Sequence, residues 1–122
     1  MLSKFSKSIA SYVEFEVALA KAARSVGDRL LEFRHLENAH VIGQESTYWH
    51  VKVHAFMFLW AVRNLMPKEV FGQFFRTIGA ALMTPIGLIP NGNTGGSNVS
   101  PFKAMPVKPE HKVMISDAKA KI

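Results

Sequence analysis

Apolar residues recur at helical spacing in four consecutive stretches of the sequence, and residues that favour helix ends separate these stretches. Gly27 and Asp28 suit the end of one helix and the start of the next. Gly43 suits the end of the second helix, and Pro67 suits the first turn of the fourth. The pattern predicts an all-α fold with helices over residues 6–26, 29–42, 47–64 and 67–84.

Acidic and imidazole side chains fall on the apolar faces of the first three predicted helices. Glu16 lies in the middle of the first apolar face. Glu37 and His40 stand three residues apart on the second, and His50 and His54 stand four apart on the third. Ionisable groups on buried faces are costly unless they are paired or bound to a cation. We therefore predict that these five residues are ligands of a buried metal ion.

Glu16 also has a structural interpretation, in which it forms a buried ion pair. Its partner would then be Arg24, Arg34 or a histidine. His35 lies about half a turn away from the apolar face of the second helix, so we expect it to be partly exposed.

The third helix is apolar nearly all round, because Phe56 and Trp60 lie opposite its two histidines. This helix is expected to be the most buried element or to face a second copy of the chain, which predicts a homodimer. On the fourth helix, the phenylalanine-rich run over residues 70–75 is interpreted as core.

Glycine and proline become frequent from Pro85 onward, so no further helix is expected. This extended segment carries many apolar residues and should pack on the helical body or on a second subunit. The tight turns from Asn91 to Asn98 are interpreted as a structural loop, with an anion-binding nest as the alternative. Residues 1–84 and 85–122 thus form one domain, in which residues 110–122 are expected to fray.

Composition narrows the chemistry of the predicted site. The 122 residues suffice for one core, and the absence of cysteine excludes disulfides and thiolate metal ligands. The net charge of +6 is not gathered into a cluster of nucleic-acid-binding density. The longest uninterrupted apolar run is Ala55–Val62, too short to span a bilayer, and the first residues lack the pattern of a signal peptide. We expect a cytoplasmic protein that binds neither nucleic acid nor membrane.

Several segments together resemble an uncharacterised bacterial family of short helical proteins, classed as a domain of unknown function. They are HLENAHVIGQ at 35–44, the H-x3-H pair at 50 and 54, GQFFR at 72–76, and PNGNTGGSNVSPFKAMPV at 90–107. The resemblance covers about residues 8–107 and implies a bacterial, cytoplasmic, helical protein. It includes Glu16, Glu37, His40, His50 and His54 but supplies no reaction.

A mononuclear site with three imidazoles and one or two carboxylates fits these residues best, and such ligands suit zinc, iron(II) or manganese. Glu37-x-x-His40 is half of the ligand pattern of di-iron helical bundles, whose other half is missing here. A dinuclear site across a subunit interface is an alternative. The pattern selects no reaction, but in an enzyme Glu37 or Glu16 would be a general base beside an open metal position.

The helices also resemble a tetratricopeptide-like pair of hairpins, so the expected architecture is either that or a four-helix bundle, with the extended segment packed on it. In this alternative the protein is a non-catalytic interaction module. Its glutamates and histidines then form a structural hydrogen-bond network. Haem binding is a third interpretation, which requires a cavity that four short helices supply only by dimerising.

Overall fold

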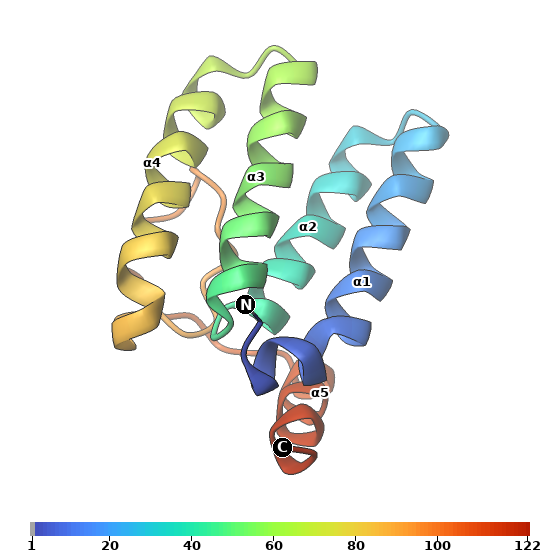
Figure 1. Ribbon diagram of the computed structural model, residues 1–122. Helices are drawn as coiled ribbons and strands as arrows, with labels where there is room; N and C mark the ends of the chain where they lie inside the picture. Colours follow the sequence, from blue (N-terminus) through green and yellow to red (C-terminus); the bar gives the residue numbers. More distant parts are fainter. Residues whose placement is uncertain (1) are drawn as a thin grey trace.

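The computed structural model describes residues 2–122, which form five α-helices, one short 3-10 helix and no strand. The elements are α1 (Lys4–Ser25), α2 (Arg29–Gly43), α3 (Thr47–Arg63), α4 (Pro67–Met83), η1 (Thr84–Ile86) and α5 (Pro109–Ala120). In Figure 1, α1 to α4 lie side by side in chain order as two successive antiparallel hairpins, and α5 lies beneath the start of α1. The predicted all-α fold is confirmed. None of the helices over these residues is long and apolar enough to cross a membrane.

Side-chain caps define the starts of the first three helices. Ser3 accepts a hydrogen bond from the Ser6 backbone N–H at 3.0 Å. Asp28 caps α2 in the same way, and Ser46 caps α3. Because these polar groups satisfy backbone donors that have no partner within the helix, the helix starts are readable from the sequence.

The core lies where α1, α2 and α3 pack against one another. Its fully buried apolar side chains include Ile9, Val13, Ala39, Ile42, Val53 and Met57. Both tryptophans are buried beside it, and each indole N–H donates to a backbone carbonyl: Trp49 to Ser6 at 3.0 Å and Trp60 to Arg29 at 2.9 Å. These bonds let the large rings pack without leaving an unsatisfied donor.

Helix α4 lies at the edge of the helical row, and its phenylalanines do not form core. Phe71, Phe74 and Phe75 are all more than half exposed. The residues that α4 buries are Gln73 and Ala80. The interpretation of this run as core is therefore wrong, because α4 packs on α3 and on the C-terminal segment while its outer face lies beyond both.

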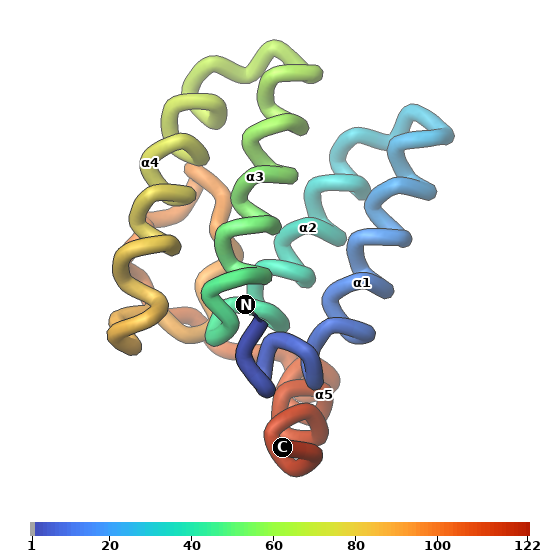
Figure 2. Tube along the Cα trace, viewed as in Figure 1, coloured from blue at the N-terminus to red at the C-terminus, as the bar shows by residue number. Residues whose placement is uncertain are grey.

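The C-terminal segment crosses the helices before it enters α5, as the trace in Figure 2 shows. Arg76 of α4 donates to the Val99 carbonyl at 2.8 Å, and Gln44 at the end of α2 donates to the Pro90 carbonyl at 2.9 Å. The prediction that residues 110–122 fray is wrong, because residues 110–120 belong to α5. The helix is anchored by fully buried Ala118, whose carbonyl accepts a bond from Ser8 of α1 at 2.6 Å.

We predict that Ala118→Asp lowers the free energy of unfolding by more than about 2 kcal/mol, because it places an unpaired charge in the contact between α5 and α1. The exposed Ala120 on the same helix provides the control, and Ala120→Asp should cost no more than about 0.5 kcal/mol. Denaturant titration measures both. Equal stability of the two variants would mean that α5 does not pack on the body in solution.

Candidate metal centre

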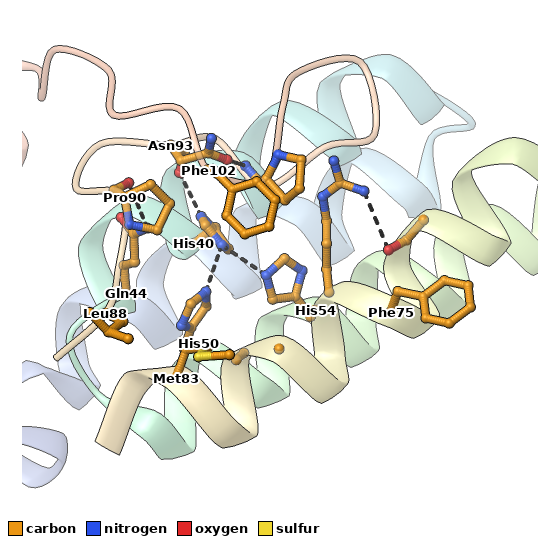
Figure 3. A pocket seen from close by; sticks show the side chains of 16 residues that line it. His40, Gln44, His50, His54, Phe75, Met83, Leu88, Pro90, Asn93 and Phe102 are labelled. Carbon is orange, nitrogen blue, oxygen red and sulfur yellow. Dashed lines mark hydrogen bonds between the residues drawn. The ribbon is translucent and has the colours of Figure 1, made fainter. Parts of the chain in front are cut away.

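Three buried histidines from two helices meet between α2, α3 and the C-terminal segment. His40 comes from α2, and His50 and His54 lie one turn apart on α3. The His40 Nε2 atom lies 3.0 Å from the His50 Nε2 and 3.0 Å from the His54 Nε2. Figure 3 shows the three rings turned toward one point. Among the described residues, the ligand atoms of these three histidines lie close enough together to hold one metal ion.

The opposite nitrogen of each ring is held by a different part of the chain. His40 Nδ1 lies 2.7 Å from the Asn93 backbone oxygen. His50 Nδ1 lies 2.7 Å from the Thr84 hydroxyl, and His54 Nδ1 lies 2.6 Å from Gln73 Oε1. Each ring is thereby fixed in orientation by a group outside the trio, an arrangement typical of metal-binding histidines.

These partners determine where the protons of two rings lie. Gln73 Nε2 donates to Glu69 at 2.7 Å and to the Gly95 carbonyl at 2.8 Å, so its Oε1 is the atom that faces His54. A carbonyl oxygen only accepts, and His54 Nδ1 must therefore donate. The Asn93 carbonyl imposes the same tautomer on His40. The Nε2 atoms of the two neutral rings therefore carry no proton, and their lone pairs face each other.

Two lone pairs 3.0 Å apart repel each other unless a positive charge lies between them. A proton on one of the rings would satisfy the pair, and so would a metal ion. In a tetrahedral site with metal–nitrogen distances of about 2.0–2.1 Å, ligand nitrogens lie about 3.3 Å apart. The spacing of 3.0 Å from His40 to each of the other rings is close to that value, and all three ligand atoms lie within 4.8 Å of one another.

Protonation of the trio is strongly disfavoured. Burial, followed by the charges of His54 and His50, lowers the pKa of His40 well below its usual range. Burial also lowers the pKa of His50 to about 3 and that of His54 to about 4, although the Gln73 hydrogen bond acts against the shift of His54. At neutral pH all three rings are therefore neutral, the state in which imidazole binds metal.

The glycine-rich loop lies directly against the trio. Gly95 has a φ of +89°, and a Cβ atom on it would lie 2.7–2.9 Å from ring atoms of His40. Asn93 fixes this loop through its side chain, which donates to the Ser100 and Lys103 carbonyls and accepts from the Gly95 N–H at 2.9 Å. The loop therefore positions His40, a structural role that agrees with its interpretation from sequence.

A cavity of about 380 Å³ is lined by all three histidines. One wall is α4, which contributes Phe75, Arg76 and Met83, and the other is the C-terminal segment, which contributes Leu88 and Phe102 (Figure 3). An ion on the trio would thus have three protein ligands and an adjacent space for an exchangeable one, the pattern of a catalytic rather than a closed structural site.

The two predicted glutamates lie outside the trio. Glu16 accepts hydrogen bonds from His35 at 2.7 Å and from Asn38 at 3.4 Å. Its contacts therefore match the structural interpretation, in which it pairs with a histidine. Glu37 lies in a separate, more polar pocket beside Thr94, and burial raises its pKa. Neither glutamate lines the cavity at the trio, where a general base would have to lie.

Sequence reasoning missed the groups that hold the rings: Gln73, Thr84 and Asn93. Gln73 is fully buried on a helix whose outer face is exposed, and Asn93 is buried within a loop. In the sequence, Gln73 stands out only as a polar residue within the apolar run 70–75. A buried amide usually has a specific hydrogen-bond partner, and this is the signal that could have identified it.

The fold and the site define an all-α protein with a buried, three-histidine cluster beside a cavity. Residues 7–115 match the family described as a protein of unknown function, DUF3703, and the chain belongs to this family. No curated protein and no solved structure matches the chain.

We predict that the metal-free protein loses stability as the pH falls below about 6.5. The folded-state pKa values of His50 and His54 lie below the unfolded value, so their contribution is fully present above about pH 6.5 and is lost toward pH 4. At pH 5 each of the two residues lowers the free energy of unfolding by about 2 kcal/mol relative to neutral pH.

Urea unfolding of the metal-stripped protein between pH 7.5 and 5 measures this slope. A His54→Gln variant, which has one titrating ring fewer, should show a shallower slope than the unmodified chain. Unfolding free energies that do not change over this interval would contradict the neutral, buried state of the trio.

Proposed function

We propose that this protein binds one divalent metal ion through the Nε2 atoms of His40, His50 and His54, and that the cavity beside the trio gives the ion an exchangeable ligand. The observation that carries the proposal is the facing pair of bare Nε2 atoms on His40 and His54, 3.0 Å apart. Among metals that three imidazoles suit, zinc, iron(II) and manganese are the candidates.

The groups behind the rings support metal binding rather than a structural network alone. Glu69, Gln73 and His54 form a chain in which a carboxylate accepts from an amide and the amide accepts from the ring. Such partners fix the tautomer and raise the basicity of a ligating imidazole. In a purely structural network, the contact between His40 Nε2 and His54 Nε2 would have no hydrogen atom to form a hydrogen bond.

A bound ion would bring Lewis acidity and would lower the pKa of a water molecule bound to it. The chain contributes the three ligands, their outer partners and a mostly apolar cavity. No carboxylate lines that cavity over residues 2–122, so Glu16 and Glu37 are not proposed as ligands or bases for the same ion. The proposed setting is the bacterial cytoplasm, as the family resemblance implies.

The alternative function is a non-catalytic interaction module in which the histidines form a structural network. The pairing of the helices into two successive hairpins favours it (Figure 1). His40→Ala distinguishes the two functions. In the structural network it lowers stability equally with and without metal, whereas in a metal site most of the loss disappears after the metal is stripped.

We predict that the protein binds one equivalent of zinc, iron(II) or manganese and that the bound metal raises the unfolding temperature. His40→Ala, His50→Ala and His54→Ala should each weaken binding by more than about 100-fold, because loss of an outer partner alone costs about 10–100-fold. Isothermal titration and elemental analysis measure affinity and stoichiometry.

His35→Gln is the matched control for these variants. His35 also lies on α2, but it contacts Glu16 and not the trio, and a glutamine there can still donate to Glu16. The His35→Gln variant should therefore bind metal as tightly as the unmodified chain. A purified protein that retains no metal and whose unfolding temperature is unchanged by all three ions would exclude the metal function.

We also propose that the protein is a homodimer that pairs through α4. Phe71, Phe75, Ile78 and Leu82 form an exposed apolar stripe along this helix. Because this stripe carries no charge, its partner must be equally apolar, and the same stripe on a second copy meets that requirement. Phe75 also borders the cavity, so the second copy would cover its mouth.

We predict that replacing both Phe71 and Leu82 by lysine converts the dimer to a monomer, because it places like charges in the centre of the contact. Light scattering coupled to gel filtration measures the mass. Val113→Lys, an equally exposed apolar position on α5, should leave the dimer intact. A monomeric unmodified chain would refute the pairing.

A further inference from the structure

The lining of the cavity at the histidine trio includes one cationic side chain and, among the described residues, no acidic one. Arg76 of α4 lines the cavity, and no aspartate or glutamate of the described residues does. The charge of Arg76 lies close enough to lower the pKa of both His40 and His54. An ion on three neutral imidazoles would add two further positive charges to the same space.

The other polar groups of the lining are already used within the chain. The Gln44 amide donates to the Pro90 carbonyl and accepts from the Gly92 N–H. The Asn93 amide donates to two carbonyls and accepts from Gly95. What remains for a ligand is the metal position on the trio and the guanidinium of Arg76.

Arg76 itself is only partly satisfied. Its two Nη atoms donate to Gly72, Ser97 and Val99, whereas its Nε–H is shielded from solvent and has no hydrogen-bond partner over residues 2–122. It forms no salt bridge among these residues, and the nearby Glu69 carboxylate accepts hydrogen bonds from Gln73 and from the Ser97 N–H. Burial lowers the pKa of Arg76, although the nearby charge of Glu69 acts against this shift.

The remaining lining is apolar, and it determines the rest of the ligand. Its side chains are Phe75, Ala80, Met83, Leu88, Pro90, Pro101 and Phe102. A cavity of about 380 Å³ accommodates a small molecule, and its walls offer contact with hydrocarbon rather than hydrogen bonds. The ligand therefore combines one negative end with an apolar body.

We propose that the cavity binds a small apolar carboxylate, with its carboxylate between the metal position on the histidine trio and Arg76 and its hydrocarbon body along α4 and Phe102. This assignment rests on the metal site proposed above. A carboxylate fits better than a phosphate, because its single charge and two oxygens need few donors, and over residues 2–122 the hydrogen bonds of Arg76 leave only one N–H of Nη2 and the shielded Nε–H without a partner. The apolar walls exclude a ligand that is polar throughout.

The test uses the protein loaded with cobalt(II), whose visible absorption changes when a ligand binds to the metal. Cobalt titration comes first and tests the metal site alone. Hexanoate is then added at neutral pH, with hexanamide as the uncharged analogue of equal length and acetate as the anion with almost no apolar body.

Hexanoate should shift the cobalt spectrum and bind at least about tenfold more tightly than either control, because acetate lacks four methylenes of apolar contact and hexanamide lacks the charge. Arg76→Gln should weaken hexanoate by about tenfold or more without changing cobalt affinity, whereas Arg76→Lys should retain part of the binding. Arg34→Gln, which removes an exposed arginine outside the cavity, is the control.

The outcomes separate the two proposals. Failure to bind cobalt refutes the metal site and, with it, the carboxylate assignment. Cobalt binding with a spectrum that hexanoate does not change, or with equal affinity for hexanoate and hexanamide, refutes only the carboxylate assignment. Should Arg76→Gln not fold, the comparison of the three compounds on the unmodified chain gives the same decision.

Discussion

Three imidazole rings whose outer nitrogens are all engaged, and whose inner nitrogens face one another, form the constraint around which this protein is arranged. The Asn93 carbonyl and Gln73 Oε1 accept hydrogen bonds, so the inner nitrogens of His40 and His54 carry lone pairs and no protons. In a buried site, such an arrangement is stabilised when a proton or a metal ion lies between the two nitrogens. The trio could hold a metal ion, which is the role that we propose for it.

Much of the fold is explained by the need to hold these rings. Helices α2 and α3 carry them, while α4 and η1 contribute Gln73 and Thr84 from the opposite side. The segment after η1 returns across the helices and brings Asn93 and Gly95 onto His40. This explains why a segment rich in glycine and proline packs on the body instead of forming a free tail.

The two faces of α4 explain the character of the cavity beside the rings. Its inner face places Gln73 behind His54 and Arg76 beside the cavity, whereas its outer face carries the exposed phenylalanines. An apolar opening, neutral imidazoles and one arginine would together make the site cationic if an ion bound there. The ligand that we propose for the site thus rests on an imbalance of charge rather than on any single residue.

The sequence by itself determined the helices and the three histidines, because caps, periodicity and imidazole on apolar faces are local properties. Only the tertiary structure decided which predicted ligands meet. Residues three apart differ by about 60° around a helix, so when His40 faces α3, Glu37 turns aside toward Thr94. Glu16 lies on α1 and meets α2, where His35 pairs with it. The roles of Gln73, Asn93 and Arg76 depend on contacts between segments far apart in the chain, which helical phase does not encode.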